Sequence, residues 1–213
     1  GVAMTFKQAM ERCGISAILR GISTAEVERV GAALVNAGVT VAEIPLNSPD
    51  PFTSIEAMAK AFNGKLVVGA GTVLSVQDVR MLAAHGGEVC VSPDCNAEVI
   101  AAARAAGMEA VPGVFTPTEA FAAIRAGATT LKLFPAEAAS PVTVKAWKAV
   151  LPPHVSLCAV GGVTPQSMKD WWQAGARGFG IGSNIYKPGR AATEVGTSVA
   201  EFVAAWNALK GTA

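Results

Sequence analysis

The sequence is poor in charge, histidine and cysteine, and each shortage argues against a class of protein. Charged residues make up 15% of the 213, and the formal net charge is +1, so no nucleic acid and no anionic membrane surface is expected as a partner. His85 and His154 have no carboxylate at ligand spacing, so we expect no metal and no other cofactor. The four cysteines, at positions 13, 90, 95 and 158, form no Cys-x-x-Cys pair. Cys90 and Cys158 lie in apolar runs and are interpreted as core residues.

Long apolar runs are also missing. No run approaches the 18 or so apolar residues of a membrane span, and the chain does not open on a basic stretch followed by an apolar one. We therefore expect a cytoplasmic protein. A hydrophobic content of 51% is typical of a compact globular domain, and this length suits one α/β barrel over residues 1–213. Gly1-Val-Ala3, ahead of Met4, is either native or an expression remnant, and the sequence leaves both possibilities open.

Glycine, in contrast, is frequent and recurs at helix ends. Residues 37–38, 85–86, 106–107, 126–127 and 174–175 each pair alanine or histidine with glycine at the end of a helical pattern, and a strand-like run follows each. Glycine after a helix suits a left-handed C-terminal cap. Gly64 and Leu151-Pro-Pro153 fill the two longer gaps, so the period is about one strand plus one helix.

Eight short runs rich in valine, isoleucine and leucine are predicted as strands buried on both faces. They are Ile15–Arg20, Val39–Leu46, Leu66–Gly69, Glu88–Ser92, Glu109–Pro112, Thr130–Phe134, Val155–Val160 and Gly178–Ile181. Capping boxes at residues 23–26 and 116–119, and N-caps at Ser75 and Thr164, predict helix starts. Eight alternations predict a single-domain α/β protein with a (β/α)8 TIM barrel. The competing open doubly wound sheet lacks a Gly-x-Gly-x-x-Gly after its first strand.

Lys132 lies in the middle of an apolar strand, where an ammonium is costly to bury. It is either an exposed lysine on an edge strand or a neutral amine kept in a dry pocket to attack a carbonyl. A closed barrel has no edge strand, and a period of two places Lys132 and Phe134 on one face, opposite Leu131 and Leu133. By the same parity Glu43 points into the barrel. The two charges form either a structural ion pair or catalytic machinery, and their position favours the latter.

Other polar residues and glycines follow the predicted strands at the end where barrels place their active sites. Arg20 ends the first strand, and Thr72 follows the glycines after the third. Gly161-Gly162 follows the seventh strand and Gly182-Ser183 the eighth. Loops at these two places, with free backbone N–H groups, are where barrels bind phosphate. Arg20 in a surface pair and Thr72 in an ordinary turn are the alternative interpretations.

Five stretches in this order make the chain resemble the 2-keto-3-deoxy-6-phosphogluconate and -galactonate aldolase family over nearly its full length. They are Ala17-Ile-Leu-Arg-Gly21, Glu43-Ile-Pro-Leu-Asn-Ser-Pro49, Val68-Gly-Ala-Gly-Thr-Val73, Leu131-Lys-Leu-Phe-Pro-Ala-Glu137 and Val160-Gly-Gly-Val-Thr-Pro165. The resemblance implies that Lys132 is the Schiff-base lysine and Glu43 the general acid/base. It implies substrate contacts for Arg20 and Thr72 at the carboxylate end, for Gly161, Gly162, Gly182 and Ser183 at the phosphate, and for Phe134 and Val160.

Two departures favour the galactonate branch of the family. The gluconate-type enzymes usually carry arginine where Asn47 stands and threonine where Val160 stands. The implied reaction is reversible cleavage of 2-dehydro-3-deoxy-6-phosphogalactonate to pyruvate and glyceraldehyde 3-phosphate in sugar-acid catabolism. A homotrimer is implied by resemblance, and exposed tryptophans would suit its interface, with Trp171 and Trp172 assigned to helix packing or to that interface.

Four alternatives stay open at this point. The gluconate epimer is the nearest one, because a single missing hydrogen bond allows overlap between the two substrates. A phosphosugar isomerase or epimerase on the same barrel would use Glu43 as a proton shuttle and form no imine. A metal-dependent aldolase is disfavoured by the scarcity of histidine. A non-catalytic sugar-phosphate binder would bind ligand without turnover.

Overall fold

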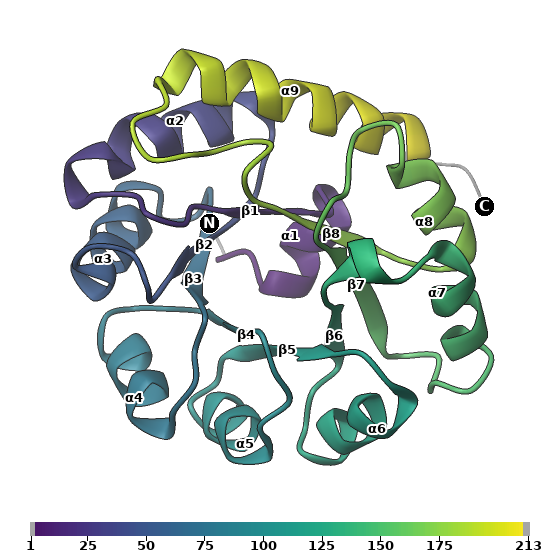
Figure 1. Cartoon of the computed structure of the whole chain (residues 1–213). Coiled ribbons are helices and arrows are strands. Elements are labelled where there is room, and N and C mark those ends of the chain that lie inside the picture. The colour runs from purple at the N-terminus through teal and green to yellow at the C-terminus, as the bar shows by residue number, and fades with distance from the viewer. Residues whose placement is uncertain (1–2, 211–213) are drawn as a thin grey trace.

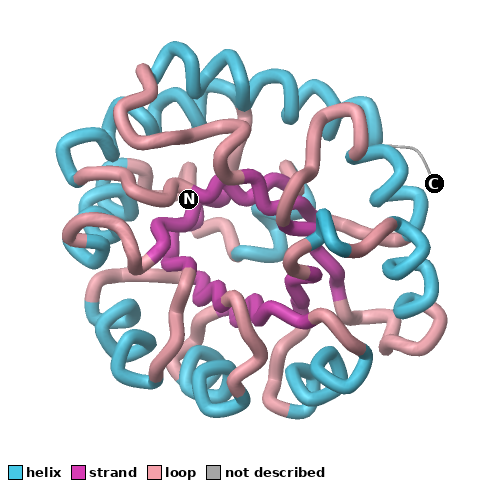
Figure 2. The backbone as a smooth tube through the Cα atoms, in the orientation of Figure 1, coloured by secondary structure: helices cyan, strands magenta, loops and turns pink. Residues whose placement is uncertain are grey.

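The computed structural model describes residues 3–210, and Gly1 and Val2 of the N-terminal tripeptide lie outside the described residues. Eight parallel strands pair in chain order, and β8 returns to β1, so the sheet closes into a barrel. Figures 1 and 2 show the strands as an inner ring with helices around it. The predicted (β/α)8 barrel is confirmed. No helix between residues 3 and 210 combines the length and the apolar character needed to cross a membrane.

The strands occupy the eight predicted runs with small differences at their ends. They are β1 Ile15–Ile18, β2 Val41–Pro45, β3 Val67–Gly71, β4 Val89–Ser92, β5 Glu109–Val114, β6 Thr130–Leu133, β7 Ser156–Val160 and β8 Gly178–Ile181. The third strand runs two residues beyond its predicted end because Gly71 still pairs with Pro45. The first ends two residues early, although the Leu19 N–H still donates to the Glu43 carbonyl at 3.0 Å.

The helices alternate with the strands and bury an apolar stripe against them. They are α1 Phe6–Arg12, α2 Val27–Ala37, α3 Pro51–Ala61, α4 Val76–Ala84, α5 Ala97–Ala105, α6 Pro117–Arg125, α7 Pro141–Lys148, α8 Met168–Ala174 and α9 Ala192–Leu209, with 3-10 turns η1 Thr24–Glu26 and η2 Ala136–Ala138. The five glycines predicted as C-terminal caps all have positive φ, between 81° and 124°. They end their helices in the left-handed conformation that glycine adopts without strain.

The predicted helix starts are confirmed at three places and wrong at one. Ser75 and Thr116 each accept a backbone N–H three residues on, and Ser23 forms its capping box at the turn before α2. Thr164 does not start a helix. Its hydroxyl accepts from the Ser167 N–H at 3.1 Å within a turn, and α8 begins only at Met168.

Helix α1 precedes the first strand and covers the N-terminal end of the barrel. Its Phe6, Ala9 and Met10 pack against inward-facing valines of β2, β3, β4 and β5. The Thr40 hydroxyl donates to the Ala9 carbonyl at 2.7 Å, and the Trp206 indole donates to the Arg12 carbonyl at 3.1 Å. Helix α1 therefore forms a floor beneath the barrel interior at its lower end, and the upper end carries the loops that follow the strands.

Helix packing, one of the two interpretations of Trp171 and Trp172, is confirmed, whereas fully exposed tryptophans that would suit an interface are not found among residues 3–210. Trp147, Trp171 and Trp206 are buried and Trp172 is partly buried. They pack between α7, α8, α9 and the barrel, since a large ring on the inner stripe of a helix removes the most apolar area from water. Cys90 and Cys158 are buried as predicted, and burial raises the pKa of each thiol to about 12.

Candidate active site

The predicted site residues gather at the upper end of the barrel around a cavity of about 540 Å³. This upper cavity lies above the ends of β1, β6, β7 and β8. Seven of the ten predicted residues line it, namely Arg20, Phe134, Val160, Gly161, Gly162, Gly182 and Ser183. They come from four different strand ends, which explains why residues far apart in the sequence meet here.

Lys132 and Glu43 lie directly below, inside the barrel. They line a second space of about 30 Å³, and Ile18, Val160 and Gly180 belong to the walls of both cavities. Lys132 is 6% exposed and Glu43 3%. Lys132 pairs with Gly113 of β5 and Cys158 of β7, which fixes its height within the barrel. The predicted inward direction of both side chains is confirmed.

The Glu43 carboxyl sits in a dry environment that favours its neutral form. Burial raises its pKa, while the positive charges of Lys132 and Arg20 act in the opposite direction. Its Oε2 atom has no hydrogen-bond partner. Gly71, on the neighbouring strand, makes room for it, because a Cβ there would lie 2.5 Å from Glu43 Oε1. A carboxyl whose pKa is raised in this way keeps its proton more readily than an exposed one and can donate it to a bound substrate.

The Lys132 amine is shifted toward its neutral form. Burial lowers its pKa, the Glu43 carboxylate opposes that change, and the Arg20 charge adds to it. Lys132 Nζ lies 4.4 Å from the centre of the Phe134 ring, so one face of the amine meets an aromatic surface. The two ion pairs within 4.0 Å in the described part of the chain lie elsewhere, at Lys60–Glu56 and Arg104–Glu109. A structural ion pair between Lys132 and Glu43 is therefore not formed.

Arg20 is held at the upper rim by two partners. Its Nη1 donates to Asn47 Oδ1 at 2.6 Å and to Thr72 Oγ1 at 3.3 Å. Thr72 adopts φ +55°, which is uncommon for a threonine and turns its hydroxyl toward the guanidinium. These contacts bring Thr72 into the site, although it does not line the upper cavity.

Two glycine loops, Gly161-Gly162 after β7 and Gly182-Ser183 after β8, form the far side of the upper cavity. Gly161 and Gly162 have φ of 115° and 70°, and a Cβ on either would meet the Glu137 side chain. The Asn184 amide donates to the Val163 carbonyl at 3.2 Å and so joins the loop after β8 to the loop after β7. Lys187 also lines this cavity.

Three functional candidates were missed at the level of sequence. Asn47 as the partner of Arg20 follows from strand parity, since Asn47 shares a face with Glu43. Lys187 lies four residues beyond Ser183, and a search of that loop for cations would have found it. Gly71 as the space for Glu43 carries no sequence signal, because only the folded register brings the two together. No group of three or more histidine, cysteine, aspartate or glutamate residues within positions 3–210 is arranged to hold a metal ion.

Comparison with known proteins gives consistent matches over most of the chain. The family model for KDPG and KHG aldolase matches residues 6–194. A probable 2-dehydro-3-deoxy-6-phosphogalactonate aldolase of Rhizobium meliloti (strain 1021) is 47% identical over 95% of each chain. The 2-dehydro-3-deoxy-6-phosphogalactonate aldolase of Escherichia coli (strain K12) is 44% identical over 89% of this chain and 93% of its own length. A solved structure described as native KDPGal has a TM-score of 0.89 at 43% identity, covering 91% of this chain and 94% of that one.

Proposed function

The chain belongs to the KDPG and KHG aldolase family, and from that premise we propose that it cleaves 2-dehydro-3-deoxy-6-phosphogalactonate reversibly to pyruvate and glyceraldehyde 3-phosphate. The observation that carries the mechanism is a lysine and a carboxyl, both buried inside the barrel, beneath a cavity walled by two glycine loops. This combination suits carbonyl chemistry on a phosphorylated substrate. The same combination supports the proposal that the enzyme is a class I, Schiff-base aldolase.

Lys132 is proposed as the nucleophile. Its neutral Nζ adds to the C2 carbonyl carbon, the carbonyl oxygen takes up a proton, and the carbinolamine loses water to give a protonated imine. The C3–C4 electron pair then moves into the imine, and the C4 hydroxyl loses its proton as glyceraldehyde 3-phosphate departs. Protonation of the resulting enamine at C3, followed by hydrolysis, releases pyruvate and restores the amine. Burial supports the first step because it lowers the Lys132 pKa.

Glu43 is proposed as the acid and base for these proton transfers. It donates a proton when the carbinolamine loses water and accepts the C4 hydroxyl proton when the carbon–carbon bond breaks. Its raised pKa lets it hold a proton where an exposed carboxyl would not. Opposite pKa shifts on the two groups favour a neutral amine beside a neutral acid, which is the pair that the first steps require.

Arg20, with Thr72, is proposed to bind the substrate carboxylate, and the glycine loops to bind the phosphate. The Arg20 guanidinium is already oriented by Asn47 and Thr72, which suits a planar carboxylate. At the other end, the backbone N–H groups of Gly161, Gly162, Gly182 and Ser183 are proposed to hold the phosphate. Lys187 supplies a positive charge to the same cavity. Phe134 supports the reacting end by packing beside Lys132.

Val160 is proposed to set the preference between the C4 epimers. It lies on the wall shared by the two cavities, between the reacting end and the phosphate end. A valine offers no hydroxyl to the C4 oxygen. The second candidate, the gluconate epimer as main substrate, is separated by comparing kcat/KM for the two epimers in a pyruvate-coupled assay. A higher value for the gluconate epimer would reverse this assignment.

Trapping with pyruvate and sodium borohydride tests the imine. We expect inactivation and a single reduced adduct that mass spectrometry places on Lys132. Lys148 is the matched internal control, because burial lowers its pKa as well, yet its amine donates to the Val155 carbonyl outside the site. Labelling of Lys148 instead, or no adduct with full retained activity, would contradict the mechanism. An isomerase would give no adduct, and loss of activity with EDTA would indicate a metal-dependent aldolase.

A homotrimer in the cytoplasm completes the proposal. Leu74, Phe115, Val142 and Val150 are large apolar side chains exposed on the single chain, and an interface would cover such residues. Light scattering on the purified protein should give three times the mass of one chain. The substrate carries a carboxylate and a phosphate, which do not cross a membrane unaided, so an intracellular pool of substrate requires a cytoplasmic enzyme.

A further inference from the structure

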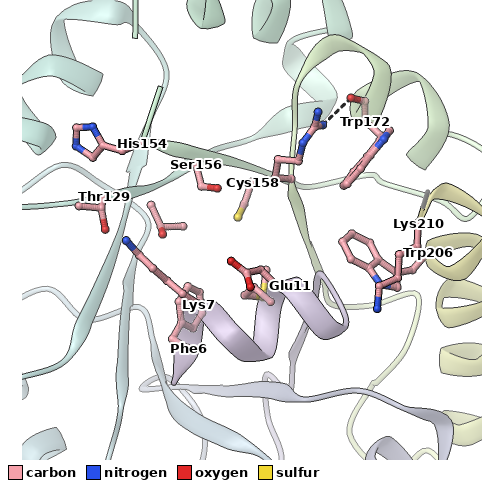
Figure 3. A pocket seen from close by; sticks show the side chains of 13 residues that line it. Phe6, Lys7, Glu11, Thr129, His154, Ser156, Cys158, Trp172, Trp206 and Lys210 are labelled. Carbon is pink, nitrogen blue, oxygen red and sulfur yellow. Dashed lines mark hydrogen bonds between the residues drawn. The ribbon is translucent and has the colours of Figure 1, made fainter. Parts of the chain in front are cut away.

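A cavity of about 500 Å³ opens at the lower end of the barrel, away from the proposed active site. We call it the lower cavity. Its walls come from α1, from the beginnings of β6 and β7, and from the segments around α8 and the end of α9. In Figure 3, Lys7 and Glu11 rise from α1, Trp172 and Trp206 lie together on one side, and Thr129 and His154 lie on the other. Its volume falls within the range of about 300–1,000 Å³ found for small-molecule sites.

One wall is an aromatic corner held by specific contacts. The Trp172 and Trp206 rings meet edge to face, with centroids 5.5 Å apart and an angle of 89°. The Arg177 guanidinium lies 4.0 Å from the centre of the Trp172 ring and donates to the Trp172 and Ala176 carbonyls at 2.9 Å. The indole of Trp206 is fixed by its bond to Arg12. A preformed aromatic wall favours a ligand with a flat ring.

The charged side chains around the lower cavity favour an anion over a cation. Lys7, Arg177 and Lys210 line it, and Glu11 is the one carboxylate among the lining residues. The excess of positive charge attracts anions into a concave, partly apolar space. Lys7 and the Ser156 hydroxyl stand toward the strands, apart from the aromatic corner, so the anionic group and the ring have separate places (Figure 3).

We propose that the lower cavity binds a small organic anion carrying a flat ring, with the anionic group at Lys7 and Ser156 and the ring at Trp172 and Trp206. An aryl carboxylate and a nucleoside monophosphate share this chemistry. The site is separate from the upper cavity and does not depend on the aldolase reaction.

Binding of benzoate and of adenosine monophosphate tests the proposal, with benzamide and adenosine as the uncharged counterparts. Titration calorimetry and quenching of tryptophan fluorescence should show saturable binding of at least one anion, at least tenfold tighter than its counterpart. The benzoate and nucleotide arms distinguish a carboxylate from a phosphate ligand. Absence of saturable binding by both anions, or equal affinity of the uncharged partners, would overturn the proposal.

Three lysine variants locate the bound probe. Lys7→Gln should weaken binding about tenfold, the effect of losing one charge-assisted hydrogen bond, and should retain aldolase activity as evidence of folding. Lys169→Gln changes an exposed lysine on α8 that does not line the cavity and should bind as the unaltered protein does. Lys187→Gln alters the upper cavity and should also leave affinity unchanged. Binding lost in Lys187→Gln but kept in Lys7→Gln would place the probe in the upper cavity and refute the assignment.

Discussion

Replacing Gly71 by alanine should show whether catalysis depends on the position of the Glu43 carboxyl, because the change moves this carboxyl without altering the residue that carries it. An added Cβ at residue 71 would lie 2.5 Å from Glu43 Oε1 and 2.9 Å from Cδ. Ordinary contact begins near 3.4 Å, so the carboxyl must withdraw by about 0.9 Å. A displacement near 1 Å of a catalytic group lowers the rate about a hundredfold. Glu43 itself remains present, buried and ionisable.

The assay compares kcat for cleavage with thermal stability. We expect kcat to fall about a hundredfold, while overpacking costs about 1–3 kcal/mol of unfolding free energy and the protein stays folded. Gly196→Ala is the matched control, because a Cβ there meets only the Ala33 methyl at 3.8 Å. That change lies within α9 and should leave kcat unchanged, with a stability gain of up to about 1 kcal/mol.

The outcome that refutes this reasoning is a folded Gly71→Ala variant with unaltered kcat. The Glu43 carboxyl would then be free to move without consequence, and its proposed role as the acid and base would lose its geometric basis. Borohydride trapping on the same variant locates the defect. Formation of the imine at a normal rate with slow cleavage would place the effect on the carbon–carbon bond step.

Three further predictions follow from the same geometry. Asn47→Ala should raise the KM for pyruvate in the aldol direction about twofold to tenfold, with little change in kcat, because one hydrogen bond to Arg20 contributes about 0.5–1.5 kcal/mol net. An unchanged KM would exclude Asn47 as a residue that positions Arg20. Val160→Thr should shift the kcat/KM ratio toward the gluconate epimer by a similar factor, and a ratio that stays constant would remove Val160 from the discrimination. The raised Glu43 pKa means that its favourable contribution to unfolding free energy is present below about pH 4.5 and is lost as the pH rises through the folded-state pKa. Glu43→Gln should therefore flatten that decline in urea denaturation measured across this window, whereas an identical decline in both proteins would contradict the assigned shift.

Strand parity explains why the interior of the site was predictable. In β6 the aliphatic Leu131 and Leu133 face the helices, so Lys132 between them has to point inward once the barrel closes. The glycine loops were predictable for a similar reason, since a pair of glycines directly after a buried strand has few structural roles. The general position of the site follows from the barrel itself, in which strand ends carry the reacting groups.

The features that escaped prediction depend on contacts between distant segments. Helix α1 spans only Phe6–Arg12, too short for a helical period to stand out, and its apolar residues acquire a purpose only beneath a closed barrel. The lower cavity joins residues 6–11 to residues as distant as 210. Thr164 is a residue type that often caps a helix, and Pro165 follows it. Here, however, Thr164 and Ser167 hydrogen-bond to each other within a turn, and Ser167 is the N-cap residue of α8.

The pKa values of Lys132 and Glu43 depend on helix α1, at the opposite end of the barrel from the upper cavity. Phe6 and Met10 form the floor of the small space that contains Lys132 and Glu43, and the same two side chains line the lower cavity. Burial is the largest cause of both pKa shifts, so the proposed chemistry requires that water be excluded from below as well as from above. The eight-fold repeat provides the walls but no floor. A segment outside the repeat therefore supplies the dry interior that turns a lysine and a glutamate into a nucleophile and an acid.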